Sequence, residues 1–461
     1  MLITTTEITP ELLKKYDRPG PRYTSYPTVP EWSAHFDSGD YRAALRRAAH
    51  SPEKAFAMYV HVPFCRERCH YCGCNVVISK KPEIVEEFLD YTAKELASVS
   101  EILGGKRRLI QLHWGGGTPT YLSVLQIERL FDRIGEHFQL DTDSELALEI
   151  DPRVTSDEQI HALRRLGFNR VSMGVQDLDP EVQRAIGRRQ TEDQTRRVYE
   201  SCRNTGFSGI NFDLIYGLPA QNLGAWEKTI QSVVDMRPDR LAIYSYAHLP
   251  DKMKHQAKMD AATLPGTQEK GQLIALARRM LVDAGYESIG MDHFALPHDD
   301  LSKALKDGRL HRNFMGYTTI ADTQVLGIGP TAISYIGNAY AQNEKRLFKY
   351  YRFLAQGDLA TTAGIALSKD DLIRRAVIEE LMCNFRLSFQ DLRERFGIEF
   401  DAYFAAEAEE LSALETDGFF ERASDGLRVL PLGQMFIRNL AMVFDAYLKK
   451  PGSTVQYSRT V

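Results

Sequence analysis

Six short apolar runs alternate with longer amphipathic runs between about residues 55 and 295 of this 461-residue chain. The short runs have the length and residue types of strands, whereas the longer runs space their apolar residues as helices do. Strands that alternate with helices pair in parallel, because each helix returns the chain to the same edge of the sheet. The predicted strands are 56–62, 109–114, 146–150, 170–175, 210–216 and 241–246.

This alternation predicts an α/β fold, a partial (β/α)6 TIM-like barrel, with a doubly wound parallel sheet as the competing architecture. In both, functional side chains belong at the carboxyl ends of the strands. The third predicted strand places Leu146, Leu148 and Ile150 on one face and Glu149 on the other. In a barrel the apolar face would meet the helices and Glu149 would point inward. The alternative is a carboxylate in water at the sheet edge.

The sequence divides into three predicted parts. Residues 1–50 have little strand pattern and contain the turn-rich GPRYTSYPT, which indicates an extended segment laid over the rest of the molecule. Residues 51–365 form the main domain. The pattern after it is mainly helical, with one short strand at 426–430, so we expect residues 366–461 to be a separate, mainly helical domain.

Composition narrows the class of protein. The chain is 43% hydrophobic and 26% charged, as in globular proteins, and its net charge of −5 argues against nucleic acid as a partner. Neither a signal peptide nor an apolar run long enough to cross a bilayer is recognisable. We therefore expect a cytoplasmic protein without a membrane partner, in a compartment where thiols stay reduced.

Four cysteines follow the first predicted strand: Cys65, Cys69, Cys72 and Cys74. The first three have the spacing C-x3-C-x2-C. A [4Fe–4S] cluster that only carries electrons normally takes four thiolates, so three leave one iron open to a small molecule. This spacing is typical of radical S-adenosylmethionine (SAM) enzymes. A structural zinc site lacks a second ligand pair here, and six cysteines make a disulfide framework improbable. Cys74 would close the open iron, so we predict that it is not a ligand.

Further motifs follow the other predicted strands. Gly115–Gly117 end the second strand and would let the backbone approach a ligand, such as the ammonium end of SAM. Glu149 could accept hydrogen bonds from ribose hydroxyls, and Tyr71 could pack on adenine. An ordinary turn and simple packing are the alternatives. Other candidate polar groups, each more plausibly structural when taken alone, are His61, Arg22, Tyr23, Arg188, His293, His311 and Arg312. The run HRNFMGYTT (311–319) could bind an anion or form a capped loop.

In order along the chain, GPRYTSYPT, YVHVPFCRERCHYCGCN, HWGGGTPTYL, FDLIYGLP and LHRNFMGYTT resemble the oxygen-independent coproporphyrinogen III oxidases. The similarity runs from about residue 12 to the last residues. It implies a radical SAM enzyme of haem biosynthesis. Such an enzyme oxidatively decarboxylates the ring A and B propionates of coproporphyrinogen III to vinyl groups, giving protoporphyrinogen IX. A 5′-deoxyadenosyl radical is the expected oxidant, because an unactivated propionate β-carbon has no acidic hydrogen for a base to remove.

The resemblance also implies cofactors and residue roles. It implies a [4Fe–4S] cluster on Cys65, Cys69 and Cys72, two SAM molecules, and an electron donor such as a flavodoxin or ferredoxin. We expect a monomer. The contacts to the cluster-bound SAM would come from Tyr59, Gly116, Glu149 and Ile333, and those to the second SAM from Tyr71, Gly117, Thr118, Gln176, Arg188, Asp213 and Ala247. We also assign Tyr59, His61 and Glu149 to catalysis.

The substrate carries four carboxylates, so its site should contain cations, for which Arg22 and Arg312 are the candidates. Two departures from the family pattern are Tyr71, often Phe in relatives, and Met315, where some relatives have Gln. Two rivals remain. One is the haem chaperone branch, which typically has CDF in place of the CGC ending at Cys74 and lacks the GPRYTSYPT extension. The other is a different radical SAM enzyme that acts on a tetrapyrrole.

Overall fold

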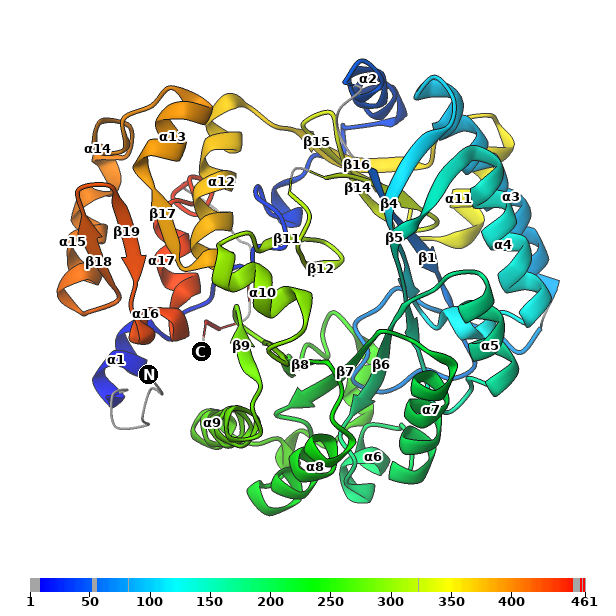
Figure 1. Cartoon of the computed structure of the whole chain (residues 1–461), viewed down its shortest axis with the longest axis horizontal. Coiled ribbons are helices and arrows are strands. Elements are labelled where there is room, and N and C mark those ends of the chain that lie inside the picture. Colours follow the sequence, from blue (N-terminus) through cyan, green and yellow to red (C-terminus); the bar gives the residue numbers. More distant parts are fainter. Residues whose placement is uncertain are drawn as a thin grey trace.

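The computed structural model describes residues 9–51, 56–81, 83–321, 323–450, 457, 459 and 460. All six predicted strands are present, and they lie side by side and parallel in chain order (Figure 1). Several are longer than the predicted runs because polar residues extend them. They are β1 (Phe56–Val62), β4 (Arg107–Gly116), β5 (Phe138–Ile150), β6 (Arg170–Gln176), β7 (Gly209–Tyr216) and β8 (Arg240–Ser245).

Helices connect these strands and cover the outer face of the curved sheet (Figure 1). Several begin at a capping box: Ser123, Ser156 and Thr191 each accept a backbone N–H of the first helical turn. The apolar strand face and the helices form one large core, in which Leu112 and Leu148 are completely buried. The helices are α3 (Glu83–Ile102), α4 (Val124–His137), α5 (Asp157–Arg165), α6 (Pro180–Ala185), α7 (Glu192–Thr205), α8 (Leu223–Met236) and α9 (Thr267–Asp283).

The sheet continues beyond the six parallel strands at both edges. Beside β1, β13 (Gln324–Ile328) is parallel, and β14 (Ile333–Ile336), β15 (Ala339–Asn343) and β16 (Thr361–Ala366) follow as an antiparallel meander. At the other edge, β10 (His293–Ala295) pairs antiparallel with β8, and β9 (Glu287–Ile289) pairs antiparallel with β10. Within the described residues β16 and β9 end the sheet without pairing to each other, so the barrel is open. The predicted partial barrel is confirmed, but the edge strands were not predicted.

Residues before β1 are more helical than predicted. Helix α1 (Pro10–Tyr16) and helix α2 (Ser38–Ala49) correct the expectation of a wholly extended segment. Helix α2 starts at a capping box on Asp37 and packs on the antiparallel edge, where Tyr41 Oη and Ser334 Oγ lie 2.8 Å apart. Residues 1–8 of the predicted extension lie outside the described residues.

The C-terminal part has its own core, and its predicted mainly helical character is confirmed. Helices α12 (Lys369–Asn384) and α17 (Ile437–Val443) pack together (Figure 1). The strand predicted at 426–430 is β19 (Gly426–Val429), the middle of a small sheet with β17 (Arg386–Ser388) and β18 (Phe420–Ala423). Three shorter helices follow α12 along the chain: α13 (Phe389–Phe396), α14 (Phe400–Tyr403) and α15 (Ala408–Thr416).

The N-terminal segment belongs to the C-terminal core rather than to a core of its own. Tyr16, Tyr23 and Tyr26 are buried there, and Tyr23 Oη donates to Asp445 Oδ2 at 2.9 Å.

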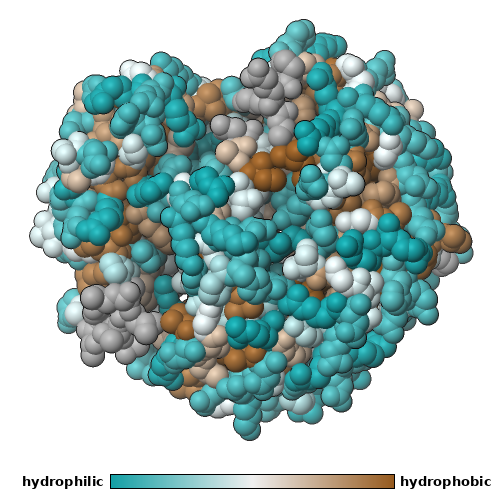
Figure 2. Space-filling model, in the orientation of Figure 1, coloured by the Kyte–Doolittle hydropathy of each residue, from teal (hydrophilic) through white to brown (hydrophobic). Residues whose placement is uncertain are grey.

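Hydrophilic side chains cover most of the face of the molecule seen in Figure 2. Of the described helices, none is both long and apolar enough to span a bilayer.

Candidate active site

The barrel strands enclose an open, polar hollow. The side chains that point outward from the strands are buried under the helices, whereas those that point inward stay partly exposed. On β5, for example, Leu148 is fully buried, but its neighbour Glu149 keeps 43% of its side chain exposed. An inward surface of this kind needs open space in front of it. The partly exposed inward residues are Tyr59, His113, Glu149, Ser172, Asn211, Asp213 and Tyr244.

The cysteines lie on a loop at the carboxyl end of β1. Strand β2 (Phe64–Cys65) pairs with β3 (Val77–Ile78) and closes the base of this loop. All four thiols are free, and Cys65 Sγ lies 3.4 Å from Thr118 Oγ1 on the neighbouring strand end. The backbone N–H of Cys74 donates to Cys72 Sγ at 3.4 Å. Cys74 is the most exposed of the four.

Two arginines on other loops face Cys69: Arg153 follows β5, and Arg188 follows α6. Arg153 Nη2 lies 3.5 Å and Arg188 Nη1 3.7 Å from Cys69 Sγ. Asp151, at the end of β5, holds both guanidinium groups, at 2.6 Å from Arg153 and 3.2 Å from Arg188. Burial raises the pKa of Asp151, but the two arginines outweigh it and leave the pKa below its ordinary value. Two guanidinium groups therefore lie beside the Cys69 thiol. Of these two arginines, only Arg188 was predicted from the sequence.

Hydrogen bonds to backbone atoms hold the loop in place from the far side. His255 Nε2 donates to Cys72 O at 2.7 Å, and Gln256 Nε2 donates to Tyr71 O at 3.2 Å. Both residues lie on a short 3-10 helix (Lys254–Lys258) after β8. Neither residue could be predicted from the sequence, because a side chain that binds a carbonyl leaves no pattern in the sequence.

Tyr59 and His61, both on β1, form a short chain. Tyr59 Oη donates to His61 Nδ1 at 3.1 Å, and His61 Nε2 donates to Asn75 O at 3.0 Å. A carbonyl can only accept, so Nε2 carries a proton, and Nδ1 can accept from Tyr59 Oη only in the neutral ring. Burial lowers the pKa of His61, which agrees with this state. Both ring nitrogens are therefore occupied, and they link Tyr59 on β1 to Asn75 on the cysteine loop.

Glu149 lies opposite this pair, at the glycine-rich end of β4. Gly116 N–H donates to Glu149 Oε2 at 3.1 Å, and His113 Nε2 lies 3.6 Å from Oε1. Burial raises the pKa of Glu149, but these donors outweigh it, so the pKa lies below its usual value. Glu149 is thus a carboxylate at neutral pH that faces the hollow, as predicted for the inward face of β5.

The three glycines are required by close protein packing. A Cβ on Gly115 would lie 2.7 Å from Glu149 Oε1, and one on Gly116 would lie 2.7 Å from the His61 ring. Gly116 also has φ of +113°, which side chains disfavour, and a Cβ on Gly117 would meet the backbone of Phe64. The expectation that these glycines only clear space for a ligand is therefore incomplete.

The remaining predicted cofactor residues lie around the same end of the barrel. Asp213 accepts from Ser172 Oγ at 2.7 Å and from Asn211 Nδ2 at 2.9 Å. Burial, with a smaller effect of the Glu149 charge, raises the pKa of Asp213 to about 6. The others occupy strand ends: Thr118 follows β4, Gln176 ends β6, Ala247 follows β8, Ile333 begins β14, and Tyr71 lies on the cysteine loop.

Arg22 and Arg312 come together although 290 residues separate them. Arg22 Nη2 donates to Asp292 Oδ2 at 3.1 Å, and Arg312 Nη1 donates to Arg22 O at 2.9 Å. Arg22 also lies 5.9 Å from the ring of Tyr244, an inward residue of β8. Among the described residues, neither guanidinium Nε has a hydrogen-bond partner. Two buried donors therefore remain for an acceptor that the protein does not supply.

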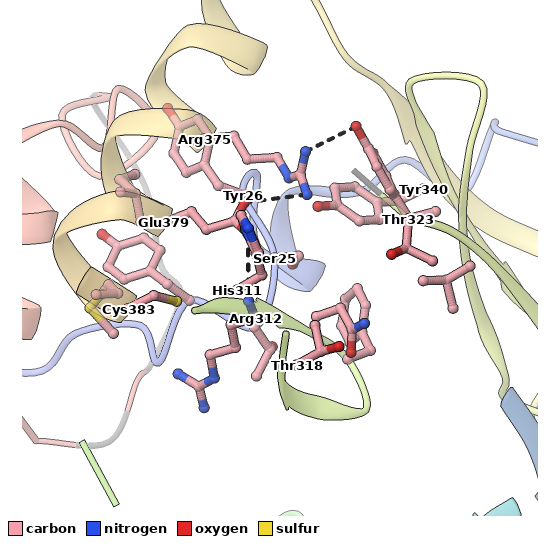
Figure 3. Close-up of a pocket in the computed structure, with 18 of the residues that line it drawn as sticks. Ser25, Tyr26, His311, Arg312, Thr318, Thr323, Tyr340, Arg375, Glu379 and Cys383 are labelled. Atoms are coloured by element: carbon pink, nitrogen blue, oxygen red, sulfur yellow. Dashed lines mark hydrogen bonds and ion pairs between the residues drawn. The ribbon is translucent and has the colours of Figure 1, made fainter. Parts of the chain in front are cut away.

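The run 311–319 is a β-hairpin of β11 (His311–Asn313) and β12 (Gly316–Thr318), not a capped loop. Behind it lies a cavity of about 50 Å³ between residues 23–26, the hairpin and α12 (Figure 3). Arg375 donates to Tyr335 Oη at 3.0 Å, and His311 pairs with Glu379 at 3.2 Å. The cavity has room for a few water molecules, not for SAM or a tetrapyrrole.

Comparison with known proteins gives the family. Residues 59–233 match the Radical SAM superfamily, and residues 367–436 match the HemN C-terminal domain. The oxygen-independent coproporphyrinogen III oxidase of Salmonella typhimurium is 43% identical over 450 residues, which cover 98% of each chain. The enzyme of Synechocystis is 42% identical over 461 residues, which cover 99% of each chain. This chain belongs to the oxygen-independent coproporphyrinogen III oxidase family.

A solved structure agrees with this family. The Escherichia coli protein described as coproporphyrinogen III oxidase (HemN), a radical SAM enzyme, is 42% identical. Its structure superimposes with a TM-score of 0.90 over 92% of this chain and 97% of that one. The resemblance and the fold class inferred from the sequence are confirmed.

Membership of the radical SAM superfamily implies a [4Fe–4S] cluster and SAM. Among the described residues, no three His, Cys, Asp or Glu side chains converge as ligands of one metal ion. A cubic cluster needs its three thiolates on three different irons, so cysteines spread along one loop suit it. The arginines beside Cys69 suit it as well, because hydrogen bonds to the sulfurs tune such clusters. The residues of this family member therefore fit the group.

Proposed function

We propose that this chain is an oxygen-independent coproporphyrinogen III oxidase that converts the ring A and B propionates of coproporphyrinogen III to vinyl groups. The full-length similarity to curated enzymes of that name supports this most strongly. Each propionate would lose one hydrogen atom from its β-carbon to the radical, one electron to an external one-electron acceptor, and carbon dioxide. The product would be protoporphyrinogen IX. The bound cluster and SAM would supply the radical that removes the hydrogen.

In this proposal, Cys65, Cys69 and Cys72 hold the cluster and Cys74 does not. Tyr59, Gly116, Glu149 and Ile333 would hold the cluster-bound SAM. A second SAM would contact Tyr71, Gly117, Thr118, Gln176, Arg188, Asp213 and Ala247. Most of these residues lie at or just after the carboxyl ends of the parallel strands, around an open hollow, and this position supports both sets. His61, with both nitrogens engaged, would act by positioning the loop rather than by touching SAM.

Arg22 and Arg312 would bind propionates of the substrate. Their adjacency, their free Nε donors and the position of Arg22 beside Tyr244 support this role. Residues 1–50 would then cover the active site of a radical SAM domain, residues 51–365, with residues 366–461 as a third part. The packing of Tyr16, Tyr23 and Tyr26 in the C-terminal core supports a covering role, since it fixes the chain on both sides of Arg22. A monomeric, cytoplasmic protein reduced by a flavodoxin or ferredoxin completes the proposal.

An anaerobic assay tests it. The reconstituted protein would be mixed with SAM, dithionite and coproporphyrinogen III, and the products separated by chromatography. We expect protoporphyrinogen IX together with methionine and 5′-deoxyadenosine. A haem chaperone would instead bind haem and leave coproporphyrinogen unchanged, and that result would refute the proposal.

A further inference from the structure

Basic side chains gather around the base of the cysteine loop. Arg66 and Arg68 lie on the loop itself, Lys80 and Lys81 follow β3, and Lys345 follows β15. All five are exposed. The chain as a whole has a net charge of −5, so this surface has the opposite sign to the molecule.

Backbone contacts bring the three basic segments together. Cys65 pairs with Ile78 in the β2–β3 ladder, and Ser79 N–H donates to Cys65 O at 3.3 Å, which places Lys80 beside the start of the loop. From the other side, Asn75 Nδ2 donates to Lys345 O at 2.8 Å. The loop that carries the thiols is therefore flanked on both sides by lysines.

Basic residues outnumber acidic ones within the three segments. Segments 66–68, 80–81 and 344–346 contain six basic residues and two acidic ones, Glu67 and Glu344. Glu344 is already engaged with Arg346 at 3.3 Å. The third segment also leads into the N-terminus of α11 (Leu347–Ala355), whose dipole adds positive potential, whereas the first turn of α3 carries the exposed acidic residues Glu83 and Glu86. We call the three segments, with Ile78 and Phe348, the basic rim.

Apolar side chains distinguish this rim from an ordinary solvated surface. Ile78 is 43% and Phe348 is 64% exposed, two of the five large apolar side chains that the described residues leave exposed. Exposed apolar groups among charges of one sign are typical of protein interfaces, where the charges steer the encounter and the apolar groups are covered.

We propose that the basic rim docks a small acidic one-electron carrier protein, which reduces the iron–sulfur cluster. This inference rests on the proposed function, because a cluster on Cys65, Cys69 and Cys72 must receive an electron from outside. The rim lies where the thiol-bearing loop reaches the surface, so a carrier seated there would approach the cluster closely. Its acidic surface would match the lysines, and its contact would cover Ile78 and Phe348.

The test measures cluster reduction rather than product. Reduced flavodoxin is mixed anaerobically with the reconstituted protein at low salt, and the bleaching of the cluster is followed by stopped-flow absorbance. The variant Lys80→Glu/Lys81→Glu is compared with Arg197→Glu/Lys228→Glu, which makes the same charge change at exposed positions on α7 and α8. Dithionite serves as a small reductant that needs no docking surface.

We expect the rate with flavodoxin to fall at least about tenfold in the rim variant and to be unchanged in the control variant. The defect should shrink in about 0.5 M salt, because screening removes the steering. The deciding quantity is the ratio of the flavodoxin rate to the dithionite rate, so partial loss of folded protein does not affect it. An unaltered ratio overturns the docking proposal. Failure to form protoporphyrinogen with dithionite would count against the proposed function instead.

Discussion

The four loop cysteines have different neighbours, so single substitutions should separate their roles. Cys65→Ala, Cys69→Ala or Cys72→Ala should abolish the visible absorbance of the cluster and SAM cleavage. Cys74→Ser should retain four irons, because the C-x3-C-x2-C spacing already supplies three thiolates and a fourth would close the iron that SAM needs. Iron analysis and anaerobic SAM cleavage check both expectations. Four irons with full activity in any of the three alanine variants would remove that thiol from the ligand set.

Glu149 is expected to hold SAM through a charge-assisted hydrogen bond, which contributes about 1.5–3 kcal/mol. Glu149→Ala should therefore weaken SAM binding roughly 10- to 150-fold in anaerobic calorimetry. Glu145→Ala is the matched control, since Glu145 lies on the same face of β5 toward its other end and bonds Gln111. Equal affinities in the two variants would leave Glu149 as a structural carboxylate that orders the Gly116 backbone.

At the scale of elements, the buried Glu95 side chain connects α3 to the antiparallel edge of the sheet through hydrogen bonds. Its carboxyl accepts from Gly329 N–H at 2.8 Å, from Asn343 Nδ2 at 2.6 Å and from Tyr350 Oη at 2.6 Å. Despite these donors, burial raises the pKa of Glu95 to about 7. The pKa of Glu95 is therefore higher in the folded state than in the unfolded state. At pH values between these two pKa values the folded state binds more protons. The protonated carboxyl thus stabilises the fold at low pH, and this stabilisation is lost as the pH rises through about 7.

Glu95→Gln cannot titrate, so its free energy of unfolding lacks that contribution. The stability advantage of the wild type over Glu95→Gln should therefore shrink between about pH 5 and pH 8, by on the order of 2–3 kcal/mol. Urea denaturation at several pH values measures it. Glu101→Gln, an exposed position on the same helix, should show no such trend. A constant difference between wild type and Glu95→Gln would mean that Glu95 is ionised throughout.

At the scale of the whole molecule, the two ends of the chain meet beside the proposed substrate site. Thr460 N–H donates to Arg18 O at 2.9 Å, and Arg438 Nη1 donates to Arg459 O at 2.7 Å. Arg438 also donates through Nε to Pro21 O at 3.0 Å, next to Arg22. Deleting residues 1–28 should spare the cluster and some SAM cleavage but eliminate decarboxylation. It would also remove three tyrosines from the C-terminal core, so a point variant is the sharper test.

Arg22→Ala should raise the KM for coproporphyrinogen III about 10- to 150-fold, the effect of losing a charge-assisted hydrogen bond to a carboxylate. SAM cleavage without substrate should be unchanged, because Arg22 lies away from the cysteine loop and contacts Asp292. Arg18→Ala, at an exposed position on the same segment, is the control and should behave as the wild type. Steady-state assays with dithionite measure both. An unchanged KM would mean that the N-terminal segment only closes the site.

The sequence by itself determined the six parallel strands, the edge that carries the chemistry and the C-x3-C-x2-C spacing, while the order of the strands in the sheet came from the structure. These features are local, because the alternation of a strand and the three-to-four spacing of a helix depend on near neighbours in the chain. The strands missed at 324–366 are short and lie at the sheet edge, and α2 follows a turn-rich segment that hides its start. Local patterns are weakest in such places.

Only the tertiary structure decided which distant residues meet. It brought Arg22 to Arg312 and Asp292, put Arg153 and Arg188 beside Cys69, and showed that Gly115–Gly117 make room for Glu149, His61 and the β1 loop. It also joined the N-terminal tyrosines to the C-terminal core. Such contacts depend on how the layers of the fold pack in three dimensions. The residue spacing in one segment does not reveal them, because each residue suits its own helix, strand or loop whether or not its distant partner is present.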